Sequence, residues 1–187
     1  RSVKLLKRIT SDVSPIHWQY GAISRLKPGE TVEKFMYGGY ATLSLGYIGM
    51  YEATLLTKGV SHTAPEGKAF AHRVMDDFNE HIRKWREETN IGFALYGTPA
   101  ESLTHRFCQK DRARFGDIKD VTDKGYYTNS YHVDVREPIN VFDKFAFESE
   151  FEDKSTGGCI SYAEIPNMTH NVPAILTMRS EERRVGK

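Results

Sequence analysis

One eleven-residue segment, from Gly92 to Ser102, constrains the fold of this chain most. It reads Gly-Phe-Ala-Leu-Tyr-Gly-Thr-Pro-Ala-Glu-Ser. The apolar run predicts a short buried strand over 91–96. Thr98 fits the N-cap of a following helix and Pro99 fits its first position, while Glu101, at the third position, completes a capping-box pattern. The segment therefore predicts a strand that ends in a tight turn and leads directly into a helix.

Such a junction favours anion binding, because free backbone N–H groups and the positive end of the helix dipole point to the same place. The hydroxyls of Thr98 and Ser102 add further donors. The alternative interpretation is a well-capped structural helix without a ligand. In that case Glu101 bonds back to the Thr98 amide and has no role in chemistry.

Hydrophobic periodicity predicts the other elements and an α/β fold class. Apolar residues at spacings of three and four predict a long helix over 65–89, with one buried face made by Phe70, Val74, Phe78, Ile82 and Trp85. A second helix is expected from Pro99 to about Arg114, with Leu103 and Phe107 facing the core. Further strands are expected over 41–48, 131–135 and 158–164, and a short helix over 50–57. The aromatic and acidic stretch from Phe142 to Phe151 is left unassigned.

Composition narrows the classes of function. The net charge is +1 in 187 residues, so charge gives no reason to expect a nucleic-acid or membrane partner. No apolar run approaches the roughly 20 residues that span a bilayer. Two cysteines, Cys108 and Cys159, argue against a disulfide framework, and we expect a cytoplasmic protein. Their spacing gives no metal-binding pattern.

The last residues differ in character from the rest of the chain. The segment 179–187 is nearly all charged, and we expect a disordered or non-native tail there. The division predicted from sequence is thus one domain over 1–178, followed by this tail. The start at Arg1 and this ending suggest an internal piece of a longer protein.

Four blocks along the chain together resemble one family, the anaerobic (class III) ribonucleoside-triphosphate reductases, which are glycyl-radical enzymes. Besides Tyr96 to Ser102, the blocks are Ala41 to Glu52, Val121 to His132, and Gly157 to Tyr162 with Pro166 to Asn171 after it. They occur in the order found in the family and cover most of the chain from about residue 40 to about residue 175.

The resemblance implies a fold and a reaction. The fold would be part, the second half, of a ten-stranded α/β barrel. The parent enzyme would convert ribonucleoside triphosphates to deoxyribonucleoside triphosphates without oxygen, and thereby supply DNA precursors. Its glycyl radical would be installed by an activase that uses S-adenosylmethionine and an iron–sulfur cluster. The parent would also carry a structural zinc and form a homodimer. The motifs for the radical glycine, the radical cysteine and the zinc are not found in this sequence, so we expect no turnover from this chain alone.

The resemblance also suggests site residues. Glu101 is expected to act as a catalytic base at the ribose. The turn residues Thr98, Pro99, Ala100 and Ser102 are expected to bind the substrate, and Asn129, Ser130 and His132 are expected to line the same pocket. No residue is assigned to a metal.

Two alternative functions stay open at this point. One is a different glycyl-radical enzyme, related to pyruvate formate-lyase, with the same barrel and another substrate. The other is a non-catalytic nucleotide-binding module.

Overall fold

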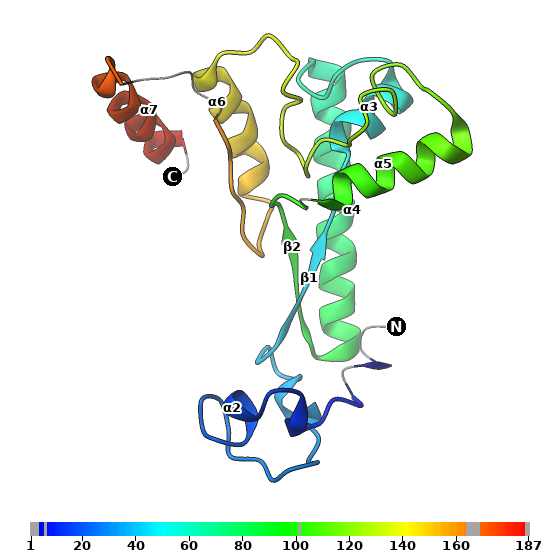
Figure 1. Ribbon diagram of the computed structural model, residues 1–187, viewed down its shortest axis with the longest axis vertical. Helices are drawn as coiled ribbons and strands as arrows, with labels where there is room; N and C mark the ends of the chain where they lie inside the picture. The colour runs from blue at the N-terminus through cyan, green and yellow to red at the C-terminus, as the bar shows by residue number, and fades with distance from the viewer. Residues whose placement is uncertain (1–3, 6, 101, 164–168, 186–187) are drawn as a thin grey trace. The chain divides into compact units, whose positions relative to one another are not determined.

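The computed structural model describes residues 4–5, 7–100, 102–163 and 169–185 (Figure 1). The chain divides into two compact units. The first unit contains residues 1–43 and 81–93, and the second contains residues 44–80 and 94–187. The elements are η1 (Ser11–Val13), α2 (Pro15–Trp18), η2 (Glu33–Phe35), β1 (Thr42–Gly46), α3 (Met50–Lys58), α4 (Pro65–Thr89), β2 (Gly92–Tyr96), α5 (Ser102–Phe115), α6 (Val141–Glu152) and α7 (Val172–Val185).

The first unit has a small apolar core of its own. Buried side chains from two separate parts of the chain meet in it, namely Leu26, Val32, Met36 and Ile91. Trp85 of α4 packs on Phe93 of β2 with ring centroids 5.7 Å apart. The Arg86 guanidinium also donates to the Phe93 carbonyl at 2.6 Å. These contacts join the end of α4 to the strand that follows it.

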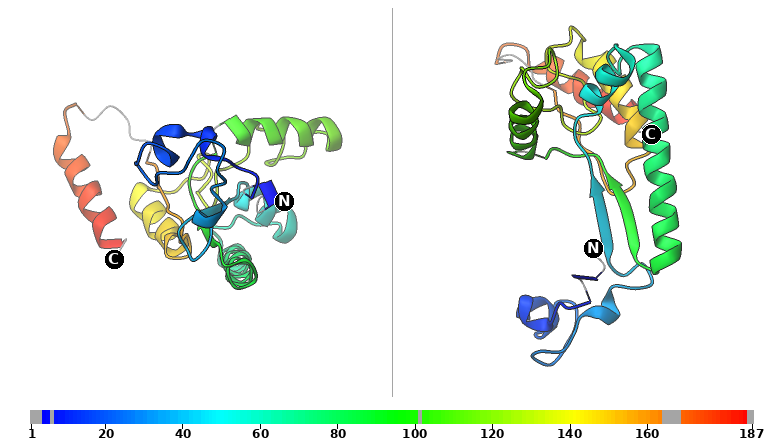
Figure 2. Two further views of the ribbon diagram at one scale, coloured as in Figure 1. Left: turned by 90° about the horizontal axis from the view of Figure 1, so that it is seen from below. Right: turned by 90° about the vertical axis from the view of Figure 1, so that its right-hand side faces the viewer.

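Helix α4 confirms the long helix predicted over 65–89, and Figure 2 shows it beside the strands β1 and β2. Asn90 ends it with φ of +56°, a left-handed conformation that Asn tolerates better than most residues. The predicted buried face is only partly correct. Ile82 is buried, but Phe70, Val74, Phe78 and Trp85 are half-buried. The side of the helix in the second unit buries Gly67, Ala71 and Met75 instead.

The sheet is smaller than the sequence predicted. Within the described residues, β1 and β2 form one two-stranded sheet, and they confirm the strands expected over 41–48 and 91–96. The strand expected over 158–164 is wrong for the residues described there, because only one parallel bridge forms, between Gly97 and Cys159. The strand expected over 131–135 is also wrong. The backbone of residues 132–134 is irregular, and the Glu148 side chain accepts from the Val133 amide.

Helix α3 confirms the short helix predicted over 50–57. Glycines in the left-handed region flank it, with φ of +79° at Gly49 and +73° at Gly59. The Gly59 amide closes the helix by donating to the Leu55 carbonyl at 2.8 Å. This is the usual glycine ending of a helix, and Gly adopts it without steric cost.

Helix α5 is described from Ser102, so the prediction that Thr98 caps it and Pro99 starts it is wrong. Its buried residues are Thr104 and Cys108, whereas Leu103 and Phe107 are 44% and 49% exposed. The prediction that Leu103 and Phe107 face the core is therefore wrong as well. The segment 122–127 packs on the Thr104 side, where the Tyr127 amide donates to the Thr104 carbonyl at 3.2 Å.

The stretch left unassigned in the sequence forms helix α6. Asn140 caps it, since its side-chain oxygen accepts from the amides of Phe142 and Asp143. Phe147 and Phe151 are buried on one face. Helix α7 continues past residue 178, where the sequence suggested a domain boundary.

Candidate functional site

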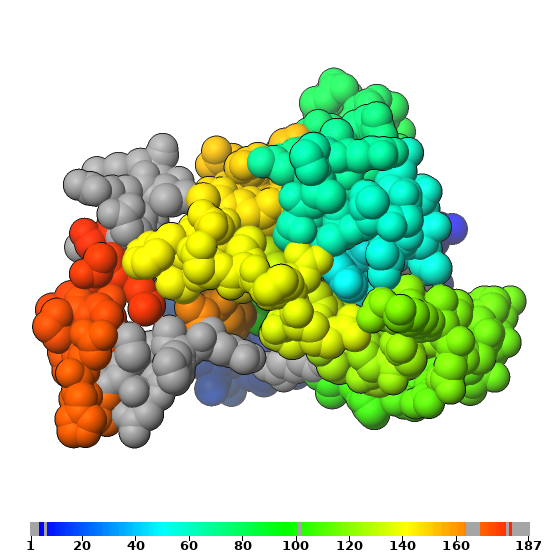
Figure 3. Space-filling view, turned by 90° about the horizontal axis from the view of Figure 1, so that it is seen from above, coloured from blue at the N-terminus to red at the C-terminus, as the bar shows by residue number. Residues whose placement is uncertain are grey.

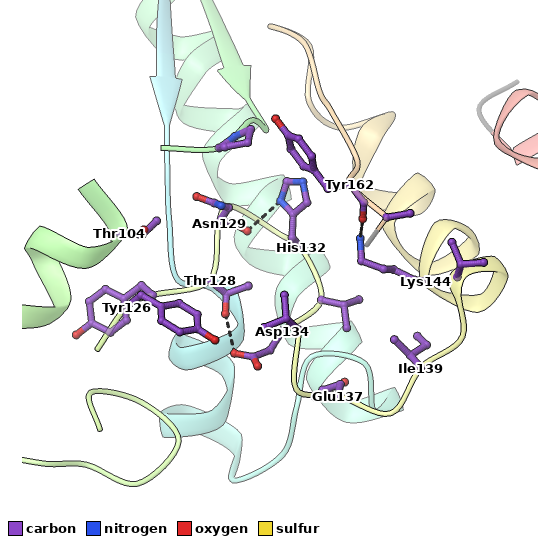
Figure 4. Close-up of a pocket in the computed structure, with 16 residues that line it drawn as sticks. Thr104, Tyr126, Thr128, Asn129, His132, Asp134, Glu137, Ile139, Lys144 and Tyr162 are labelled. Atoms are coloured by element: carbon purple, nitrogen blue, oxygen red, sulfur yellow. Dashed lines mark hydrogen bonds between the residues drawn. The ribbon is translucent and has the colours of Figure 1, made fainter. Parts of the chain in front are cut away.

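A pocket of about 580 Å³ lies in the second unit. Its walls come from Pro99 after β2, from Thr104 on α5, from the loop 126–137 and from the start of α6. Tyr162, near the end of the described part of this region, closes one side. Figure 4 shows the labelled side chains around the pocket. In Figure 3 the yellow-green to yellow atoms of the loop lie beside the green atoms of α5.

The turn that follows β2 contributes less of the pocket than the sequence suggested. Pro99 lines it, whereas Thr98, Ala100 and Ser102 are not among its lining residues. Thr98 is buried and Ser102 is exposed. Glu101, the expected catalytic base, lies outside the described residues.

Asn129 joins the loop to this turn. Its side-chain oxygen accepts from the Ala100 amide at 3.0 Å. The Ala100 backbone N–H is one of the donors expected to bind an anion. In this structure it bonds the uncharged side-chain oxygen of Asn129. Asn129 also lines the pocket, and its contact with substrate stays a prediction.

Ser130 lies beside Asn129 but holds the backbone together and does not line the pocket. It is fully buried, and its hydroxyl lies 3.0 Å from the Thr98 carbonyl and 3.2 Å from the Tyr47 carbonyl. Its φ of +36° is unusual for a residue other than glycine. The surrounding hydrogen bonds therefore keep this turn in a strained conformation.

His132 lines the pocket and is held by two carbonyl groups. Nδ1 lies 3.0 Å from the Asn129 carbonyl and Nε2 lies 2.6 Å from the Ile160 carbonyl. This ring is therefore well fixed in orientation.

The ring of His132 also begins a stack of four parallel rings. It lies 4.8 Å from the Tyr131 ring, which lies 5.6 Å from Phe151, which lies 4.3 Å from His72 on α4. The interplanar angles are 5°, 10° and 1°. Close stacking of buried rings keeps the pocket wall rigid.

Three buried charged side chains form a cluster beneath the pocket, namely Glu52, Lys124 and Asp134. The side chains are 3%, 3% and 0% exposed. Lys124 Nζ lies 2.5 Å from Glu52 Oε1 and also pairs with Asp134. Sequence reasoning missed this cluster. Glu52 and Lys124 lie in two of the blocks that carry the family resemblance, but their charges are 72 positions apart in the sequence, and only the fold pairs them.

Asp134 stays ionised in this cluster. Burial acts to raise its pKa, but hydrogen bonds from Lys124 and from the Arg136 backbone and side chain outweigh burial and lower the pKa to about 2. Arg136 Nε lies 3.0 Å from the second oxygen of Asp134. Two cations therefore share this one carboxylate.

Helix α6 supplies the opposite wall through Lys144. Its ammonium lies 2.8 Å from Glu148 Oε1 and donates to the Tyr162 carbonyl. The same Glu148 oxygen accepts from the Val133 amide at 3.0 Å. In a strand over 131–135, the Val133 amide would donate to a neighbouring strand. Here it donates to Glu148 instead.

Neither cysteine is part of the pocket. Cys108 is buried and Cys159 is half-buried, and burial raises the pKa of both thiols. Among the residues that the structure describes, no group of three or more His, Cys, Asp or Glu side chains is arranged to hold a metal ion. In the same residues, no helix is both long and apolar enough to cross a membrane.

The sequence as a whole matches one family. Residues 1–183 match the family model described as anaerobic ribonucleoside-triphosphate reductase, and the chain belongs to this family. The chain is 40% identical over 174 residues to the anaerobic ribonucleoside-triphosphate reductase of Enterobacteria phage T4. It is 39% identical over 173 residues to the one from Escherichia coli strain K12. These alignments cover 92% and 91% of this chain but only 27% and 24% of the relatives, so the chain spans about a quarter of their length.

Solved structures are similar in fold. The anaerobic ribonucleotide reductase from Thermotoga maritima with MES in the active site aligns with a TM-score of 0.66 and 20% identity, over 99% of this chain and 31% of that one. The same enzyme in complex with dATP and CTP aligns with a TM-score of 0.63 and 19% identity, over 97% and 30%. The α/β arrangement is thus shared with about a third of that enzyme.

Proposed function

We propose that this chain forms part of the catalytic barrel of an oxygen-independent reductase that converts ribonucleoside triphosphates to deoxyribonucleoside triphosphates. The pocket between Pro99 and Tyr162 would bind the substrate. The observation that carries the proposal is the convergence on one pocket of two blocks that resemble the family, the turn after β2 and the loop 126–132. The two blocks are joined by the hydrogen bond that the Ala100 amide donates to the Asn129 side-chain oxygen.

The aromatic and polar side chains of this pocket would suit a nucleotide. Tyr126, Tyr127 and Tyr162 offer aromatic faces for a base, and Asn129 and His132 offer polar groups. We propose that the Asn129 side chain, whose oxygen is held by the Ala100 amide, would donate through its NH2 group to a phosphate oxygen of the substrate in a charge-assisted hydrogen bond.

Glu101 is proposed as the group that accepts a proton from the ribose. Removal of hydrogen from the 3′ carbon is easier when a base holds the proton of the 3′ hydroxyl, and the 2′ hydroxyl has to leave as water. The radical that abstracts this hydrogen would come from other parts of the complete enzyme.

The complete enzyme is proposed to act as a cytoplasmic homodimer with a separate activase, which would install its glycyl radical. The relatives' length leaves about three quarters of such a chain to supply the radical groups. We also propose that this chain contributes one section of the catalytic barrel.

The substitution Glu101→Gln in the complete, radical-activated enzyme tests the proposal. We expect substrate affinity to stay close to the wild-type value and turnover to fall by about 10²–10⁴-fold, the usual effect of losing an acid–base group. Near-normal formation of deoxynucleotides by this variant would show that Glu101 is not the base. Turnover of a small acyl substrate such as pyruvate, with none of a ribonucleotide, would instead indicate a relative of pyruvate formate-lyase.

A further inference from the structure

We propose that the buried cluster of Glu52, Lys124 and Asp134 is a positioning network that holds Asn129 and the pocket loop in their binding geometry. The inference rests on the proposed function, because it assigns residues that prepare the same pocket for a nucleotide. None of the three is proposed to touch the reacting atoms.

The first observation is the way Glu52 holds the loop. Its Oε1 accepts from the Thr128 amide at 2.7 Å and from the Thr128 hydroxyl at 2.8 Å. On the other side of the residue, the Thr128 carbonyl accepts from the Gly49 amide at 2.8 Å. Both peptide groups of Thr128 are thus fixed to the start of α3, one residue before Asn129.

The second observation is the placement of Lys124. Its ammonium donates to the Thr128 hydroxyl at 3.0 Å and pairs with both carboxylates. It also lies over the rings of Tyr51 and Tyr126, 4.8 Å and 4.9 Å from the centroids. Without this cation, the buried carboxylates of Glu52 and Asp134 would face each other across the Thr128 hydroxyl. Arg136 would still bond the other oxygen of Asp134. Buried like charges at this range repel strongly.

The third observation links the network to the binding groups. Thr128 and Asp134 line the pocket themselves, and Thr128 directly precedes Asn129. Any shift of the Thr128 peptide moves Asn129, and the Asn129 oxygen is the group that meets the Ala100 amide. The cluster therefore acts on the proposed phosphate position through one residue, and this predicts an energetic coupling between Glu52 and Asn129.

A double-mutant cycle for nucleotide binding tests this coupling. In the complete reductase, the dissociation constant of CTP is measured for Glu52→Gln, Asn129→Ala and the double variant. We expect each single change to weaken binding about tenfold, which corresponds to 1.4 kcal/mol. The double variant should bind within about twofold of Asn129→Ala alone, because both changes remove the same arrangement. Additive losses, about a hundredfold in total, would overturn the proposal.

Conservative variants separate positioning from general stability. Thr128→Ser keeps the hydroxyl and should bind CTP within about twofold of wild type, whereas the similarly shaped Thr128→Val should lose about tenfold. This pair decides the question if Glu52→Gln does not fold. Equal affinities for the two variants would contradict a positioning role. Glu87→Gln is the matched control, since it removes a surface carboxylate that pairs with Arg83 and should leave binding unchanged.

Amide hydrogen exchange in this 187-residue chain gives a readout that does not depend on the proposed function. Glu52→Gln should speed exchange at the Thr128 and Ala100 amides, and the control Glu87→Gln should not. If the wild-type reductase binds no ribonucleotide, the proposed function fails, and the exchange rates still decide whether the network orders the loop. Unchanged exchange at both amides would overturn the network.

Discussion

Gly67 gives a sharp test of the packing in the second unit, because the substitution Gly67→Ala should destabilise a helix that Ala normally favours. The residue is buried in the first turn of α4. A Cβ there would lie 2.1 Å from the Ser61 carbonyl oxygen, 2.8 Å from its carbon and 2.9 Å from the His62 Cα. All three are backbone atoms, so no side-chain rotation relieves the overlap.

The magnitude follows from two opposing terms. Ala in place of Gly inside a helix gains about 0.5–1 kcal/mol. Overpacking costs about 1–3 kcal/mol, and contact with backbone at 2.1 Å puts this case at the upper end. We therefore expect a net loss of about 2 kcal/mol. In a chain of this length, such a loss lowers the unfolding midpoint by about 4–8 °C.

Thermal unfolding followed by circular dichroism measures this shift. Gly46→Ala is the matched control, because its backbone is not in the left-handed region and a Cβ there meets nothing within 4 Å. We expect the control to stay within about 0.5 kcal/mol of wild type. A midpoint for Gly67→Ala that equals or exceeds that of wild type would refute the reasoning.

Two further predictions concern titratable groups. Because the pKa of Asp134 is lowered from 3.8 to about 2, its contribution of about 2 kcal/mol is present above pH 3.8 and is lost as the pH falls through 2. Urea unfolding across this range should show a steeper loss of stability for wild type than for Asp134→Asn, and equal slopes would contradict the assignment. Alkylation with iodoacetamide, followed by mass spectrometry, should modify half-buried Cys159 at least about tenfold faster than buried Cys108. Modification in the reverse order would show that the region around Cys108 opens first.

The elements that the sequence predicted well are those whose signals are local. The period of α4 and the glycines around α3 depend only on neighbouring residues, and both helices have the predicted bounds to within one residue. The face of α5 was predicted wrongly because Leu103 and Phe107 are the more apolar pair. Its buried side is set by the 122–127 segment, which follows later in the chain.

The site was predictable only in part, because many of its contacts join residues that are far apart in the sequence. Asn129 and His132 line the pocket, and their contact with substrate stays a prediction, whereas the Ser130 hydroxyl lies against two backbone carbonyls. The alternation in 131–135 resembles a strand, yet Glu148 takes the Val133 amide and no neighbouring strand is available to it among the described residues. The charges of the buried cluster come from distant positions, so no spacing rule in the sequence could pair them.

The stack of rings that starts at His132 makes the pocket observable from a distance. Its last ring, His72, has a side chain that is 23% exposed and lies flat against Phe151. Aromatic ring currents shift the resonances of protons on a neighbouring stacked ring, so the NMR signals of His72 depend on where Phe151 and Tyr131 lie. The half-buried imidazole of His72 thus serves as a built-in probe of the pocket wall, and it needs neither a dye nor a label near the pocket.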